Sequence, residues 1–303
     1  MKELLNEWRK YTQQILSEEA DPAHLDPKLF PLPLSKVQPA RAKQVTSTGK
    51  PELDKKGDDD VIPVNAGAQI AVSALKPSQS SMNIGKAMGM VVSMLDPGTD
   101  FNAGGNLGAF ISKDNYIMDG HHRWIATAMI NPALKVGGYQ VGWPGQQLVP
   151  VLNAITKGRL GIMKGKPASG GFEQFRPEPV KKQLAALAQQ GNKGGGQSAE
   201  EVMNILQKFT GVKGPQAVEA AANKMSKNLS TLTLQAPSWA PERPDMPVID
   251  PDKVPGATKT AAVAMAKGEV DVNPPYGTGA LIKKKKTGVA SKTGGAKPVG
   301  LPS

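Results

Sequence analysis

A short polar motif between a strand and a helix constrains the fold of this chain most. Residues 115–118 have the pattern of a buried strand, and the helical pattern that follows ends at Pro132. The connecting residues and the first helical turn read Asp119-Gly120-His121-His122-Arg123. A strand that passes through two residues into a helix indicates mixed secondary structure, and we expect an α+β fold.

The motif has the properties of an anion-binding site. The N-terminus of a helix carries free N–H groups and partial positive charge, and both favour phosphate. His121, His122 and Arg123 add donors there, and an arginine can hold phosphate through two parallel hydrogen bonds. Asp119 is the expected N-cap, and Gly120 lets the backbone approach a ligand closely. The structural alternative is a surface turn in which the histidines cap the helix and contact water.

The same residues resemble the phosphate-binding motif of the ParB/sulfiredoxin superfamily. A Gly-x-x-Arg-x-x-Ala box binds a nucleoside triphosphate in ParB, and Gly120, Arg123 and Ala126 match its fixed positions. Residues 70–79 are similar to the opening strand and the Pro/Gln loop of that family, and this adds Lys76 and Gln79 as expected phosphate ligands. The resemblance implies a small mixed sheet with helices, CTP or ATP as the nucleotide, and Mg²⁺ as a cofactor.

The chain also departs from this superfamily. Sulfiredoxin has its reactive cysteine where this chain has His121, and the chain contains no cysteine, so thiolate chemistry is excluded. ParB's second nucleotide box has no convincing counterpart, because residues 152–155 lack its acid and its arginine. No helix-turn-helix is evident. A chromosome-partition clamp is therefore not expected.

Three activities fit the motif, and phosphate binding is common to them. In the first, the motif binds nucleotide phosphates while Asp119 assists Mg²⁺ or a nucleophile. The resemblance to the superfamily implies phosphotransfer as the reaction in this case. In the second, His121 or His122 is the general acid or base that cleaves a DNA phosphodiester, and Arg123 stabilises the transition state. In the third, the motif binds the DNA backbone without catalysis.

We therefore predict a ParB-like phosphate- or nucleotide-binding protein associated with DNA, with nuclease, nucleotide hydrolase or phosphotransferase activity. The alternative is a non-enzymatic internal virion or assembly protein of a tailed phage. A metal site built from histidines is not expected, because adjacent helical residues point about 100° apart. The third histidine, His24, lies in a proline-rich segment.

The charge of the chain is uneven. The net charge is +11, and residues 277–303 contain six lysines and no acid. Such a tail binds nucleic acid through counterion release, or it simply keeps the protein solvated. The predicted nucleic-acid-binding residues of the tail are Lys283, Lys284, Lys285 and Lys286.

Residues 2–19 have the pattern of an amphipathic helix. A helix this short needs a surface to pack on, which is either the protein's own core or a capsid or other virion protein. The opening residues resemble leaders of proteins from large tailed phages, and Leu16-Ser17-Glu18 is similar to the Leu-x-Glu sites of prohead proteases. No apolar run is long enough to cross a bilayer. We expect a soluble protein in the host cytoplasm or in the virion, with no membrane partner.

Composition predicts one modest core with long flanks, because 33 glycines and 26 prolines accompany only 5% aromatic residues. Ser198 and Glu201 predict a capping box at the start of a helix. Around the motif we expect strands at 69–74 and 109–112, a tight turn at 104–108, a helix at 84–95, and a strand or short helix at each of 136–141 and 148–152. The expected organisation is an amphipathic helix (1–19), a linker (20–60), a ParB/sulfiredoxin-like domain (61–165), a helical satellite (166–235) and an extended basic tail (236–303).

Overall fold

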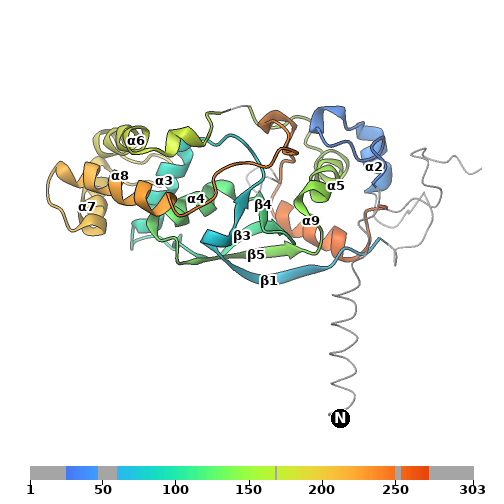
Figure 1. Cartoon of the computed structure of the whole chain (residues 1–303), viewed down its shortest axis with the longest axis horizontal. Coiled ribbons are helices and arrows are strands. Elements are labelled where there is room, and N and C mark those ends of the chain that lie inside the picture. Colours follow the sequence, from blue (N-terminus) through green and yellow to red (C-terminus); the bar gives the residue numbers. More distant parts are fainter. Residues whose placement is uncertain (1–24, 47–59, 168, 250–253, 273–303) are drawn as a thin grey trace, which may run out of the picture.

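A mixed β-sheet lies at the centre of the computed structural model, which describes residues 25–46, 60–167, 169–249 and 254–272 (Figure 1). Within these residues the sheet has five strands in the order β1-β5-β3-β4-β2. They are β1 (Val64–Ala71), β2 (Lys76–Pro77), β3 (Gly105–Ser112), β4 (Tyr116–Asp119) and β5 (Lys135–Val141). The β1–β5 and β3–β4 pairs are antiparallel, whereas β3–β5 and β2–β4 are parallel. The expected α+β class with a mixed sheet is confirmed.

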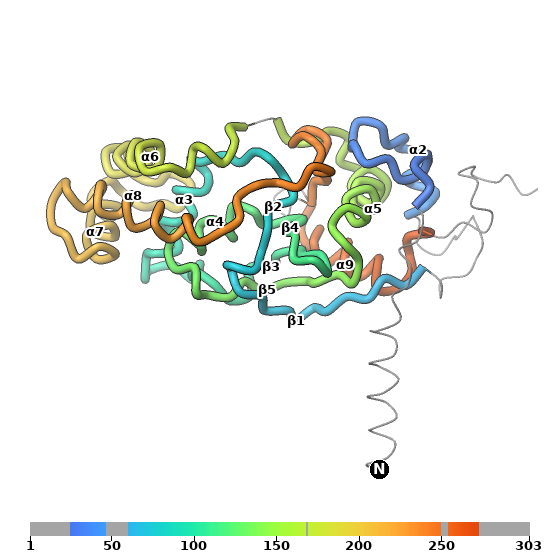
Figure 2. Tube along the Cα trace, in the orientation of Figure 1, coloured from blue at the N-terminus to red at the C-terminus, as the bar shows by residue number. Residues whose placement is uncertain are grey.

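Helices pack on both faces of the sheet (Figures 1 and 2). The first hydrophobic core contains α3 (Ile84–Leu95), α4 (His121–Ile130), α6 (Pro177–Gln190), α7 (Ala199–Thr210) and α8 (Gln216–Leu229). The second contains α2 (Pro39–Val45), α5 (Gly145–Gly158) and α9 (Ala257–Ala266). Successive strand residues point to opposite faces, so Ala109 and Ile111 enter the first core and Phe110 enters the second.

Several local predictions are confirmed. The helix at 84–95 is α3. The segment 136–141, expected as a strand or a short helix, is a strand within β5. The segment 148–152 lies inside α5, which decides between the two expected alternatives in favour of a helix. The capping box of α7 is complete, because Ser198 Oγ accepts from the Glu201 amide at 3.3 Å and Glu201 Oε2 accepts from the Ser198 amide at 2.7 Å.

The glycine-rich segment at 104–108 differs from the expected turn. The strand β3 begins at Gly105, and its pairing with β5 shifts register between Asn106 and Ala109. This irregularity is a bulge, and Gly105 and Gly108 permit it because they adopt positive φ angles of 73° and 63°. The bulge places the Leu107 carbonyl beside the motif, as described below.

The helical region does not stand apart as a satellite. Leu184 of α6, Leu206 of α7 and Met225 of α8 are buried in the same cluster as Trp124 of α4. The helices α6, α7 and α8 therefore extend the first core, and α8 packs directly on α4.

Two segments that were expected to be linker or tail form part of the second core, and the extended-flank prediction is wrong for them. Residues 25–46 include α2, with Leu29 and Val45 buried, and residues 254–272 include α9, with Ala261 buried. The helix α9 forms because alanine has the highest helix propensity, and its small side chain permits close packing. The prediction for residues 2–19 lies outside the described residues. No helix in the described part of the chain is long and apolar enough to cross a membrane.

Candidate anion-binding site

The start of α4 is built by Gly120. This residue is the N-cap, and its φ of 98° lies in the left-handed region that favours glycine. The N-cap prediction for Asp119 is wrong. Asp119 is the last residue of β4, and its carboxylate pairs with Arg123. No side chain caps α4, so its first N–H groups have no side-chain acceptor from the N-cap.

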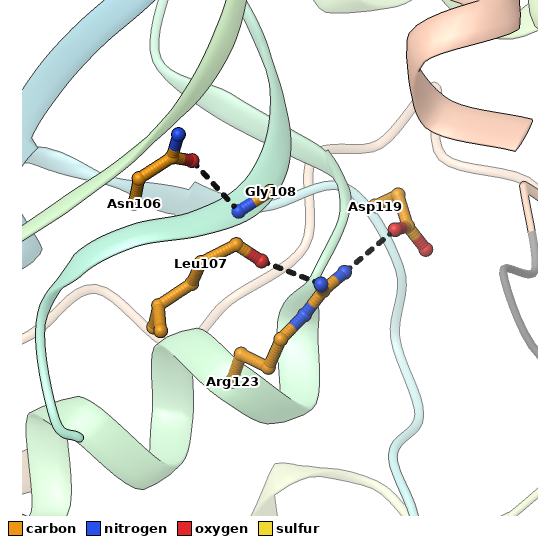
Figure 3. A network of polar contacts seen from close by, with 5 residues as sticks. All are labelled: Asn106, Leu107, Gly108, Asp119 and Arg123. Carbon is orange, nitrogen blue, oxygen red and sulfur yellow. Dashed lines mark hydrogen bonds and ion pairs between the residues drawn. The ribbon is translucent and has the colours of Figure 1, made fainter. Parts of the chain in front are cut away.

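Arg123 connects three elements of the site (Figure 3). Its Nη2 donates to Asp119 Oδ2 at 2.8 Å, and its Nη1 donates to the Leu107 carbonyl at 2.5 Å. The bulge that carries Leu107 is held by Asn106 Oδ1, which accepts from the Gly108 amide at 3.1 Å. Two of the five N–H donors of the guanidinium are therefore used within the protein. Arg123 contributes positive charge to the site, but its Asp119-bound face is not a free fork for phosphate.

Both histidines accept hydrogen bonds from backbone amides. The Ser78 amide donates to His121 Nε2 at 3.2 Å, and the Asn83 amide donates to His122 Nε2 at 3.2 Å. The Ser78 hydroxyl donates its proton to the Ile117 carbonyl at 2.5 Å, so it leaves Nε2 of His121 as an acceptor. A neutral imidazole that accepts at Nε2 carries its proton on Nδ1. Each neutral ring therefore has one N–H donor, on Nδ1.

The surroundings hold both histidines neutral. Burial, together with His122 and the charges of Arg243 and Arg123, lowers the pKa of His121 to about 3. Burial also lowers the pKa of His122 to about 3, with repulsion from Arg243, Lys86, Lys166 and Arg123. A general base is most effective when its pKa lies near the working pH, so neither histidine of the unliganded protein suits proton transfer at neutral pH.

A cavity of about 280 Å³ lies at the N-terminus of α4. Its volume is close to the lower end of the range for small-molecule sites, about 300 Å³. The predicted residues that line it are Gln79, Asp119, Gly120, His121, His122 and Arg123. Lys76, which was predicted as a phosphate ligand, is not among the lining residues. Its Nζ lies 4.3 Å from the centre of the Tyr116 ring, in a cation–π contact.

Three cations of the cavity were not found from the sequence, namely Lys86, Lys166 and Arg243. Arg243 belongs to a short 3₁₀ helix, η4 (Arg243–Asp245), and is only 8% exposed. Its Nη1 donates to the Ser81 carbonyl at 3.0 Å, whereas its Nε has no hydrogen-bond partner among the described residues. Burial lowers the pKa of its guanidinium. A buried charge with an unused donor is costly, and the negative charge of an anion in the cavity would offset part of that cost.

The residues do not fit a protein-held Mg²⁺ ion. Asp119 is the only acid among the described residues that line the cavity, and Arg123 already binds its carboxylate. Nowhere in the described ranges do three or more His, Cys, Asp or Glu side chains form a group that could hold a metal. The four predicted tail residues, Lys283 to Lys286, lie outside the described residues.

Comparison with protein-family models, curated proteins and solved structures found no match. The geometry alone therefore defines the class of site. It is a cationic cavity at an uncapped helix N-terminus, with a buried arginine in its wall.

Proposed function

We propose that this chain is a ParB-like phosphate-binding protein, and that the cavity at α4 binds the phosphate groups of a nucleotide such as CTP or ATP. Arg243 is the observation that carries the proposal. It is more than nine-tenths buried, it lines the cavity, and its Nε has no partner among the described residues. Burial of this charged group destabilises the folded protein, and a bound anion would explain why such a group is present.

The donors of the cavity match the needs of a phosphate. The first N–H groups of α4 supply backbone donors at the positive end of a helix dipole. The Nδ1–H groups of His121 and His122 add two neutral donors, and the Arg243 guanidinium adds a charged one. Phosphate oxygens accept hydrogen bonds from all three kinds of donor.

We propose that the site binds phosphate and that its histidines do not act as acid–base catalysts. Their Nε2 atoms are occupied by backbone amides, and their pKa values are about 3 in the unliganded protein. Nuclease, nucleotide hydrolase or phosphotransferase activity, with Asp119, His121 or His122 as catalytic groups, is therefore the second candidate. Association with DNA or with a phage virion rests on residues 2–19 and 283–286, which are not described.

A thermal-shift series tests the proposal. CTP, ATP and inorganic phosphate, each with and without Mg²⁺, are added to the wild type and to the Arg243→Gln and Lys86→Gln variants. A ligand at 100 times its dissociation constant stabilises the folded state by about 2.7 kcal/mol. We expect the shift to be strongly reduced in both variants.

The matched control is Lys76→Gln, which removes a lysine that contacts Tyr116 and does not line the cavity. Its ligand-induced shift should equal that of the wild type. Lys86 is exposed, so its variant tests binding even if Arg243→Gln fails to fold. Shifts that survive in both cavity variants, or that disappear in Lys76→Gln, contradict the proposed site.

A further inference from the structure

We infer that the cavity prefers a terminal phosphate, that is a monoester with two negative charges, over the singly charged phosphodiester of an internal DNA position. This inference rests on the proposed function and names the class of phosphate that the site takes. It is carried by the balance of charge in the cavity wall, by the burial of its donors and by its apolar lining residues.

The wall carries an excess of positive charge. Lys86, Arg123, Lys166 and Arg243 line the cavity, and Asp119 is the only acid among the described lining residues. Among the described lining residues, Lys86, Arg123 and Arg243 against Asp119 leave two positive charges, because His121 and His122 are neutral at neutral pH. A phosphodiester compensates one of these charges. A monoester compensates nearly two at pH 7, because its second proton dissociates at about pH 6.

The donors of the cavity belong to three elements. They come from α3 through Lys86, from the first turn of α4 through the two histidines, and from η4 through Arg243. His121 and Arg243 are 5% and 8% exposed, so a phosphate that reaches both must enter deeply. A terminal phosphate offers three unsubstituted oxygens to these donors and enters by its free end. An internal phosphate offers two, and its strand must leave the cavity on both sides.

The remainder of the wall suits an organic group attached to the phosphate. Met90 and Phe101 form part of it, and Met246 and Val248, which follow η4, form another part. Apolar walls beside a few charged donors are typical of small-molecule sites. Two sources supply such a ligand, namely a free mononucleotide and the 5′-phosphorylated end of a DNA strand.

Two matched pairs of ligands test the inference by titration calorimetry on the full chain. The first pair is AMP and its methyl ester, which differ by one methyl group and one negative charge. The second pair is a short single-stranded oligonucleotide with and without its 5′ phosphate. We expect AMP to bind at least about tenfold more tightly than its methyl ester, from one additional charge in a cationic site. The preference should shrink in Lys86→Gln, which removes one cavity cation.

The second pair identifies the source. Tighter binding of the 5′-phosphorylated oligonucleotide supports a DNA end, and equal binding of both oligonucleotides beside a clear AMP preference supports a free mononucleotide. If AMP and its methyl ester bind equally and both lose affinity in Arg243→Gln, the inference is wrong while the proposed function stands. If no phosphate compound shows any dependence on Arg243 or Lys86, the proposed function fails, and the inference fails with it.

Discussion

The Nε2 atom of His121 accepts a hydrogen bond from the backbone amide of Ser78 at 3.2 Å. This contact joins the residue after β2 to the first turn of α4, and it fixes the proton of the neutral ring on Nδ1. Protonation of Nε2 would place two N–H groups against each other. The local fold therefore requires His121 to be neutral, and burial of the ring favours the same state.

The first prediction is a loss of stability at mildly acidic pH. The pKa of each histidine is 6.5 in the reference state and about 3 in the folded protein, so the unfolded chain binds more protons below pH 6.5. Stability is then full above pH 6.5 and falls as the pH drops toward 3. Each histidine should lower the free energy of unfolding by about 2 kcal/mol between pH 7.5 and pH 5. Urea denaturation at the two pH values measures this change.

The control for this prediction is His122→Gln, which keeps a polar acceptor in place of an imidazole. About half of the pH-dependent loss should disappear in this variant, because His121 still titrates. A wild-type protein that is equally stable at both pH values would show that the two rings are not held neutral.

The sequence predicts the elements of the site better than it predicts the cavity. Local signals, such as the apolar spacing of α3 and the Ser198–Glu201 box, depend on residues a few positions apart, and these predictions are confirmed. Arg243 and Lys86 carry no local signal, because only the packing of η4 and α3 around α4 brings them to His122. The N-cap prediction for Asp119 is wrong because an aspartate just before a helix can either cap the helix or pair with an arginine in its first turn. Sequence spacing alone does not decide between these two roles.

The second prediction concerns the turn into α4. Gly120→Ala should lower the free energy of unfolding by about 1 to 2 kcal/mol, because a Cβ is unfavourable in the left-handed region. The new Cβ would also lie 3.4 Å from the Cα and Cβ of Ala109. Gly67→Ala is the matched control, since its Cβ would meet nothing closer than 3.9 Å and its φ is not positive. Chemical denaturation of both variants should show a loss in the first only.

The third prediction separates the Arg123–Asp119 pair from an ordinary surface pair. Its side chains are 20% and 26% exposed, whereas those of Lys181 and Glu219 are 39% and 62% exposed. A double-mutant cycle with Arg123→Gln and Asp119→Asn should give a coupling free energy of roughly 1 kcal/mol. The same cycle with Lys181→Gln and Glu219→Gln should give roughly 0.3 kcal/mol. Equal couplings would mean that Arg123 does not hold the site together.

The fourth prediction uses Trp124 to measure how much stability is lost when a structural residue of this core is replaced. Trp124 is fully buried, and its Nε1 donates to the Val72 carbonyl at 3.1 Å. Trp124→Phe removes this donor and leaves both a buried carbonyl and unfilled volume. The free energy of unfolding should fall by about 2 to 3 kcal/mol. Denaturation followed by circular dichroism measures the loss. A change below about 0.5 kcal/mol, which is typical of a surface substitution, would contradict the structural role of Trp124.

The last prediction asks whether Arg243 serves the fold or the ligand. If Arg243 were structural, its removal would resemble Trp124→Phe, because the Ser81 carbonyl would lose a partner. We expect the opposite for Arg243→Met, because methionine fills much of the same space without a buried charge beside Lys86, Lys166 and Arg123. Replacing a poorly satisfied buried charge with an apolar side chain is often neutral or stabilising by about 1 kcal/mol or more. Unliganded Arg243→Met should therefore be at least as stable as the wild type, while its stabilisation by nucleotides is lost. Functional residues often lower the stability of the folded protein. An Arg243→Met variant that is stable but no longer responds to nucleotides would therefore identify Arg243 as a functional residue. A variant that loses 2 kcal/mol or more without ligand would instead place Arg243 among the residues that hold the fold.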